Sequence, residues 1–434
     1  MKLSKFLRFR WLFLGLLMAA LLTAAACGDD EEEAQGTPSA QFDGTIKIGV
    51  IADLSGPGGV SVSTLSHIAG MNSAIKEINA NGGVKVAGKS YKMEVVTVDS
   101  RADATQAVAA AQQLIDQKVH AVYLGNLQPD QSYQQLKDKV ISWSASPGVT
   151  YHIDSPGPPR PGEGPDNHPL LFSNIDGFAP IVAAHLKMAT LAYPSIQKVG
   201  ILAADSPFGV NLTRGTEAAA QQVGLQFVGS VSVPVGSTDV APFATTMKTR
   251  GADFVFLATQ PNIVVAANGA LEANMAKYLG GWTIRPFDIR TQMRALGSTV
   301  FISPDWRLPF HKGLVPQQYQ QAVAKLEDLP GGEPRHTGWA ISEWDWMYLL
   351  KQAFEKAGTL DDPRAIATAL IGQTYQGPFG TTTVLPNHTA RGTIGMSVKD
   401  GDTYTVYGWK DIDSVLKGEQ PLIKFSAPAA EVER

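Results

Sequence analysis

The chain has 434 residues, of which 44% are hydrophobic and 18% are charged. This balance is typical of a globular protein and excludes a largely disordered one. The formal net charge is −4, from 36 Lys and Arg against 40 Asp and Glu, which gives no electrostatic basis for binding nucleic acid. The single cysteine, Cys27, excludes an intrachain disulfide and a cysteine-based zinc site. The length predicts about two or three domains.

The N-terminal segment has the organisation of an export signal. Four basic residues precede or border an apolar run at residues 11–22, which has the length of a signal-peptide core and is too short to span a bilayer comfortably. Three alanines then stand directly before Cys27, an arrangement that resembles the bacterial lipobox. An ordinary secretory signal with a chance cysteine is the alternative. We therefore predict a signal peptide over 1–26 and lipidation of Cys27.

An acidic segment rich in small residues follows the cysteine and carries no apolar periodicity. Such a composition is typical of a flexible tether, which we expect over residues 27–43. A lipid chain and a tether together predict an extracytoplasmic protein anchored to the cell membrane, either periplasmic or on the cell surface.

Strands and helices alternate at the start of the folded part. Apolar segments predict strands at residues 45–52, 91–98 and 121–124. Between the first two, apolar residues at helical spacing predict a helix that ends at Asn81-Gly82-Gly83. Asp103, three residues before Gln106, predicts the N-cap of a helix that runs through Ile115. This order predicts a parallel sheet covered by helices.

A segment rich in proline and glycine, residues 155–169, separates this region from a second one of the same kind. His152 and His168 flank the segment and are expected at the surface. Further strands are predicted at 199–203, 226–233 and 254–258, with helices at 209–223 and 240–250 between them. Near the C-terminus the sequence predicts a helix over 341–357 and a hairpin over 392–409 that turns at 399–402.

Several of these segments together resemble one known family. They are the export signal and the sequences IKIGVIADLSGPGG, AIKEINANGGV, YKMEVVTVDSRADATQAV, KVGILAADSPFGVNLTRG and GADFVFLAT. The succession resembles the type I periplasmic binding proteins of the branched-chain amino acid (Leu/Ile/Val-binding) group, and the resemblance covers about residues 44–409.

The resemblance implies an α/β fold of two Rossmann-like lobes that are joined by three crossovers and close on a ligand in the cleft between them. We expect the crossovers near residues 171–175, 301–306 and 377–380. Lobe one would comprise 44–170 and 304–377, and lobe two 171–303 and 378–434. Ligands of such sheets lie outside the carboxyl ends of the strands.

The resemblance also implies ligand-binding positions, among them a hydroxyl at Thr150 that meets the polar head of the ligand and aromatic walls at Phe208 and Trp339. The predicted ligand-binding set is Ser61, Asn126, Gln128, Ser146, Gly148, Thr150, Asp205, Phe208, Gln260, Trp282 and Trp339.

Two positions depart from the family pattern. Pro129 stands where the family has a serine that binds the amino-acid carboxylate, and proline has no donor. The acid that pairs with the ligand ammonium would align near Trp282-Thr283, where no acid stands. Because an unpaired buried charge is costly, these differences argue against an α-amino acid and favour a flatter or more apolar molecule against Trp282 and Trp339.

Other interpretations have weaker support. Gly56-Pro57-Gly58 with Ser61 and Asp99 matches a dinucleotide-binding fingerprint only in part. The histidines show no zinc-binding spacing, and no serine-hydrolase motif is present. Trp344 and Trp346 are expected to pack in the core rather than to bind ligand, whereas Asp205 could either face the ligand or cap the next helix.

These observations predict a binding protein and not an enzyme. It would capture a small organic ligand, such as an amino acid or a related carboxylate, amide or aromatic acid, by hinge closure. It would then deliver the ligand to the permease subunits of an ABC importer, as a monomer and without cofactor or metal. A sensor module that signals to a membrane receptor is the alternative, because such lobes serve both roles.

Overall fold

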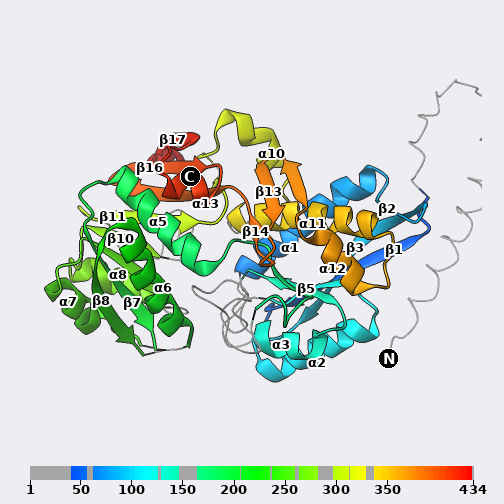
Figure 1. Ribbon diagram of the computed structural model, residues 1–434. Helices are drawn as coiled ribbons and strands as arrows, with labels where there is room; N and C mark the ends of the chain where they lie inside the picture. Colours follow the sequence, from blue (N-terminus) through cyan, green and yellow to red (C-terminus); the bar gives the residue numbers. More distant parts are fainter. Residues whose placement is uncertain are drawn as a thin grey trace, which may run out of the picture. The chain divides into compact units, whose positions relative to one another are not determined.

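The computed structural model describes residues 41–55, 62–125, 129–145, 164–205, 207–234, 237–259, 263–281, 297–311, 313–328 and 337–432. Two large sheets, here called sheet A and sheet B, organise these residues (Figure 1). A third, small antiparallel sheet contains β12 (Thr374–Gly377), β13 (Gly380–Val384) and β14 (Ala390–Arg391).

Sheet A has the strand order β2-β3-β1-β4-β5-β6 within the described residues, and every pairing except that of β2 is parallel. Its strands are β1 (Gly44–Ala52), β2 (Val84–Val86), β3 (Lys89–Asp99), β4 (Ala121–Tyr123), β5 (Ile141–Ser144) and β6 (Leu171–Ser173). Helices α2 (Ala104–Asp116) and α3 (Pro129–Leu136) cover one face, and α1 (Val62–Ala80) and α11 (Thr337–Ala357) cover the other (Figure 1).

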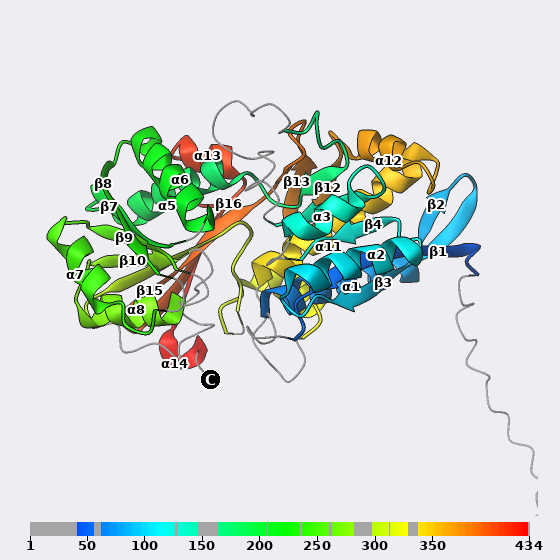
Figure 2. The ribbon, with the colours of Figure 1, turned by 90° about the horizontal axis from the view of Figure 1, so that it is seen from below.

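Sheet B has the order β17-β16-β15-β11-β10-β9-β7-β8, and its second half is parallel. Its strands are β7 (Lys198–Ala204), β8 (Gln226–Val233), β9 (Phe254–Ala258), β10 (Tyr278–Gly281), β11 (Val300–Asp305), β15 (Ile394–Asp400), β16 (Thr403–Trp409) and β17 (Ile423–Pro428). Figure 2 shows α5 (Phe178–Ala192) and α6 (Pro207–Val223) on one face, with α7 (Ala241–Thr249) and α8 (Ile263–Glu272) on the other.

The remaining elements are short. They are η1 (Gln317–Tyr319), α10 (Gln320–Ala324), α12 (Pro363–Leu370), α13 (Ile412–Leu416) and α14 (Ala429–Val432). None of the helices in the described ranges is long and apolar enough to cross a membrane.

The alternation of side chains along the parallel strands explains why helices cover both faces of each sheet. In β9, Phe254 and Phe256 join the apolar cluster under α5 and α6, whereas Val255 and Leu257 join the cluster under α7 and α8. A strand with both faces buried reads as a continuous apolar run, which is why the sequence predicts β9 with its observed bounds.

The chain passes three times between the two large sheets within the described residues. The first passage follows β6, the second follows β11, and the third lies between β14 and β15. The predicted lobe boundaries at 170/171, 303/304 and 377/378 stay a prediction. The expected architecture of two Rossmann-like α/β lobes is confirmed by the two parallel, helix-covered sheets.

Most of the predicted elements are confirmed. Strand β8 has the predicted bounds, and the C-terminal hairpin of β15 and β16 turns at the predicted place. Asp103 accepts a hydrogen bond from the backbone N–H of Gln106 at 2.9 Å, as expected of an N-cap. Helix α11 begins at Thr337, four residues before the predicted start, because its first turn is buried and the hydroxyl of Thr337 donates to the carbonyls of Leu308 and Phe310.

One prediction about the surface is wrong. His168 was expected to be exposed but is buried, and its Nδ1 lies 3.2 Å from the hydroxyl of Tyr133 on α3. The proline-rich composition of the neighbouring segment suggested exposure. His168 lies shortly before β6, however, and packs against α3. His152 lies outside the described residues.

Candidate functional site

Most of the predicted ligand-binding residues lie outside the part of the chain that the structure describes. They are Ser61, Asn126, Gln128, Ser146, Gly148, Thr150, Gln260 and Trp282, and Cys27 also lies there. Their roles therefore stay predictions. The described residues nevertheless place the ends of the strands that carry several of these loops.

Three predicted residues fall on described backbone. Asp205 is exposed directly after β7, and its backbone N–H donates to the carbonyl of Val233 at 2.8 Å. Phe208 belongs to the first turn of α6. Trp339 belongs to the first turn of α11 and is 8% exposed.

Trp339 is the centre of an aromatic stack. Its ring lies 5.4 Å from the ring of His67 at an interplanar angle of 14°, and 5.6 Å from the ring of Trp306 at 24°. His67 comes from α1 and Trp306 follows β11, so the stack joins three elements that are distant in sequence. Trp339 is thus a packed aromatic of the core with little exposed surface.

Helices α1 and α11 approach each other closely because a glycine stands at their contact. A Cβ added at Gly70 would lie 2.2 Å from the carbonyl oxygen of Ala340, a distance that no side chain tolerates. The two helices run in the same direction, since Gly70 meets Ala340 and the hydroxyl of Tyr348 donates to Glu77 at 2.7 Å further along. This approach brings His67 against Trp339 and Glu343.

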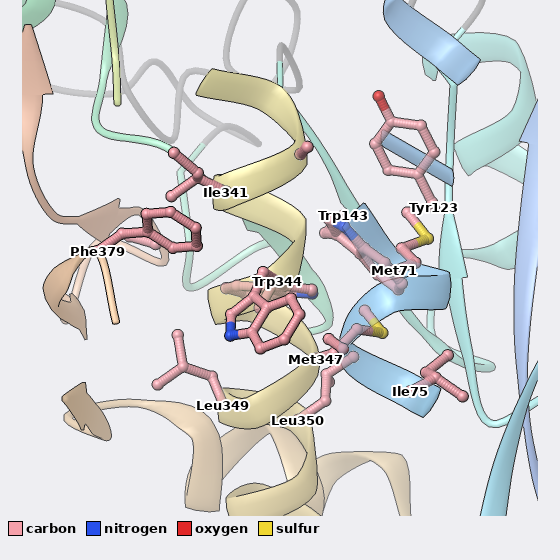
Figure 3. Close-up of a cluster of buried hydrophobic side chains, with 14 of the residues drawn as sticks. Met71, Ile75, Tyr123, Trp143, Ile341, Trp344, Met347, Leu349, Leu350 and Phe379 are labelled. Atoms are coloured by element: carbon pink, nitrogen blue, oxygen red, sulfur yellow. The ribbon is translucent and has the colours of Figure 1, made fainter. Parts of the chain in front are cut away.

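Glu343 is fully buried between α11 and sheet A. One of its oxygens lies 2.8 Å from Nδ1 of His67 and accepts from the amide of Asn174 at 2.6 Å, and the other accepts from the indole N–H of Trp143 at 3.1 Å. Figure 3 shows Trp143 beside Met71 and Tyr123, so that an apolar shell surrounds this polar cluster. Three polar groups, two of them donors from Trp143 and Asn174, thus contact one carboxyl group in a site without exposed surface.

The electrostatics of this region follow from burial. Burial raises the pKa of the Glu343 carboxyl, although the hydrogen bonds from His67, Trp143 and Asn174 act in the opposite direction. Burial also raises the pKa of Asp345 to about 6, against the attraction of Arg307.

His67 is held on three sides. Its ring lies between Tyr123, at 4.8 Å and 33°, and Trp339, and its Nδ1 meets Glu343. Its side chain has no exposed surface, and its Nε2 has no hydrogen-bond partner. A buried polar atom without a partner is uncommon in a folded protein and calls for a physical reason.

Two arginines tie the three passages between the sheets together. The buried Arg307 donates to the carbonyl of its neighbour Trp306 at 2.8 Å and to the carbonyl of Asn174 at 3.2 Å, which links the second passage to the first. Arg391 donates to Asp176 at 2.7 Å and so links the third passage to the first. Charge-assisted bonds of this kind hold the crossing segments in register.

Of the partial dinucleotide fingerprint, the structure describes Asp99, which binds the backbone of its own and the neighbouring loop. Asp99 accepts from the N–H groups of Leu54 and Arg101, at 3.0 and 2.9 Å, and from the hydroxyl of Ser55 at 2.6 Å. A carboxylate that already accepts these hydrogen bonds is not available to bind a ribose. Within the described ranges, no group of histidines and acids is arranged to hold a metal ion.

Trp344 and Trp346 pack in the core as predicted, each 1% exposed. The cluster of His67, Trp143, Asn174 and Glu343 was not predicted. Its signal in the sequence is the run Trp339 to Trp346, in which Glu343 and Asp345 stand among tryptophans and aliphatic residues. An acid within a helical stretch whose other residues are mostly apolar has no solvent-facing side, so it is expected to be buried with donors.

Comparison with known proteins identifies the fold. The profile of a family described as periplasmic binding protein matches residues 45–401. A curated relative, Leu/Ile/Val-binding protein homolog 7 of Brucella abortus, is 24% identical over 383 residues, which cover 83% of this chain and 91% of the relative.

Solved structures show the same fold. A solute-binding protein of an ABC transporter from Rhodopseudomonas palustris, in complex with p-hydroxybenzoic acid, superposes with a TM-score of 0.64 at 20% identity, covering 88% of this chain and 98% of that one. The branched-chain amino acid binding protein LivJ of Streptococcus pneumoniae, in complex with isoleucine, superposes with a TM-score of 0.63 at 19% identity, covering 84% and 99%.

Proposed function

Because this chain belongs to the periplasmic binding protein family, we propose that it captures a small carboxylate, either an amino acid or an aromatic acid, and delivers it to an ABC importer. The observation that carries the proposal is the family profile, which spans both α/β lobes. The family consists of binding proteins and not of enzymes. Among its structural neighbours, the named ligands include benzoate, p-hydroxybenzoic acid and isoleucine, each of which has a carboxylate.

The mechanism follows from the two sheets. In parallel α/β sheets, ligands bind beyond the carboxyl ends of the strands, where loops from several strands converge. A ligand that contacts both lobes stabilises the closed arrangement by its additional contacts there. The predicted loop residues Asn126, Thr150 and Gln260 follow β4, β5 and β9 in the sequence, which supports their assignment to such a site.

A thermal-shift screen tests this function. L-leucine, L-isoleucine, benzoate and 4-hydroxybenzoate are added to the purified protein, and a ligand at about 100 times its Kd stabilises by about 2.7 kcal/mol. We expect at least one acid to raise the melting temperature, and small-angle scattering with that acid to give a smaller radius of gyration. No shift with any acid of the panel would overturn the proposal.

We also propose that lipidated Cys27 anchors the protein to the membrane. The support is the position of the single cysteine directly after an apolar run and three alanines. Cys27→Ser should move the protein from the membrane fraction to the soluble fraction after cell fractionation. Unchanged membrane association of the variant would contradict the anchor.

A further inference from the structure

The unpartnered nitrogen of His67 has a defined direction. Nδ1 meets Glu343, which lies one helical turn deeper along α11 than Trp339, the residue on which the same ring stacks. Nε2 lies on the opposite edge of the imidazole and therefore faces the N-terminal ends of α1 and α11.

These helix ends lie at the carboxyl edge of sheet A. Helix α1 follows β1 in a parallel unit, so it begins where β1 ends, and α11 runs in the same direction as α1. Tyr123, which lies against the other face of the His67 ring, is the last residue of β4. The free nitrogen is therefore directed to the edge where ligands of such sheets bind.

We propose that His67 is a ligand-contacting residue whose Nε2 hydrogen-bonds the carboxylate of the captured solute, with Glu343 as the positioning residue on the opposite edge of the ring. The inference rests on the proposed function and names the group in this chain that recognises the acid. Glu343 holds the ring, and Tyr123 and Trp339 prevent it from tilting, so that the nitrogen is oriented before the ligand arrives.

The hydrogen bonds of this cluster favour a ligand that carries a carboxylate. The indole N–H of Trp143 and the amide of Asn174 both donate to Glu343, so we take its carboxylate as the acceptor of the His67–Glu343 bond and assign the proton of that bond to Nδ1. In a neutral ring with its proton on Nδ1, Nε2 carries a lone pair. A bound carboxylate cannot donate to that lone pair, so binding requires a proton from solvent to add to Nε2, with no other bond made or broken.

The resulting imidazolium lies between two carboxylates, that of Glu343 and that of the ligand. Such an arrangement neutralises the charge that an acid brings into a closed site. The other titratable or charged groups near it are Tyr123 on β4, Asp305 at the end of β11, whose carboxylate lies against Gly338 beside Trp339, and Arg307 beyond Glu343. Arg307 is bound to the carbonyls of Trp306 and Asn174 and lies 3.9 Å from Asp345. Arg307 is thus occupied in holding the passages between the sheets.

The test uses calorimetric titration of the full protein with whichever acid of the panel (L-leucine, L-isoleucine, benzoate or 4-hydroxybenzoate) binds the wild type most tightly. His67→Phe keeps a ring between Tyr123 and Trp339 but removes Nε2, and should weaken binding about 10- to 100-fold. Titrations at pH 7.5 in phosphate and in Tris should show uptake of about one proton per ligand in the wild type and none in the variant.

His120→Phe is the matched control. His120 directly precedes β4, at the opposite end of the strand from Tyr123, and its Nδ1 accepts from the N–H of Lys47 at 3.0 Å. It should bind the acid with wild-type affinity and wild-type proton uptake. Affinity within twofold of the wild type in His67→Phe, together with unchanged proton uptake, would overturn the inference while leaving the proposed function intact.

A measurement on the wild type covers the case in which His67→Phe does not fold. In ¹⁵N NMR spectra, the imidazole of His67 should be protonated at Nδ1 alone without ligand and at both nitrogens with the acid bound. An unchanged His67 signal at saturation would overturn the inference. If no acid of the panel binds the wild type, the proposed function fails and the inference fails with it.

Discussion

The two large sheets are covered by helices in the same way, but the two helix layers differ in what they bury. Under α5 and α6, sheet B presents apolar residues such as Ile201 and Phe256, and a buried titratable group of this layer is the imidazole of His185 on α5. Under α1 and α11, sheet A presents an apolar layer that surrounds the carboxylate of Glu343. Since replacement of a whole buried ionic cluster by well-packed apolar residues is often neutral or stabilising, the layer of sheet A holds a polar cluster that the fold alone does not require.

The largest expected effect is the removal of that carboxylate. Glu343→Leu leaves the donors of His67, Trp143 and Asn174 buried without an acceptor, so it should lower the free energy of unfolding by about 3–5 kcal/mol. Glu343→Gln keeps one acceptor oxygen and should lose less. In sheet B, Ile201→Val should lose only about 1 kcal/mol. Urea denaturation measures all three, and a loss in Glu343→Leu no larger than in Ile201→Val would remove the contrast between the layers.

The next effect compares two glycines that allow close packing in the two lobes. A Cβ at Gly70 would meet the backbone carbonyl of Ala340 at 2.2 Å, whereas a Cβ at Gly200 in β7 would meet the flexible Sδ of Met247 at 2.4 Å. Backbone cannot move aside as a thioether can. Gly70→Ala should therefore lower the free energy of unfolding by about 2 kcal/mol, even after the gain in helix propensity, and Gly200→Ala by less than about 1 kcal/mol.

Thermal melts of both variants measure this difference in stability. A greater loss of stability in Gly200→Ala than in Gly70→Ala would show that the α1–α11 contact is the more tolerant of the two.

The smallest effect is a dependence on pH. Burial raises the pKa of Asp345 to about 6 from an ordinary value of 3.8, so between these values the folded state holds a proton that the unfolded state has released. This group therefore lowers stability as pH rises from about 4 to 6. Between pH 5 and pH 7 the wild type should lose about 1 kcal/mol through this group, which Asp345→Asn abolishes. Equal pH dependence of stability in the wild type and the variant would contradict the assignment.

The sequence predicted the regular parts of the fold well, because strands with both faces buried leave continuous apolar runs between turn residues. Such runs delimit β7, β8 and β9 to within one residue. The short strand β2 was missed because three residues carry too little periodicity, and β6 because it follows the proline-rich segment.

The candidate site was predictable only in part. Its loop residues were assigned by resemblance, because a loop carries no periodic pattern from which contacts can be derived. The pairing of His67 with Glu343 joins positions 276 apart in the chain, and local pattern does not reveal it. The acid among the tryptophans of α11 indicated a buried polar group, but its partners depended on the close approach of two helices at Gly70.

The order in which the chain is synthesised bears directly on α11 and on β15. Sheet A is complete once β6 is made, yet the layer over one of its faces needs α11, which begins more than 160 residues later. Sheet B likewise needs β15 to pair with β11. A chain that has reached only residue 330 therefore has both sheets with uncovered apolar faces or unpaired edges, and neither lobe can finish folding until the last quarter of the protein exists. The native state therefore forms only after α11 and β15 have been synthesised.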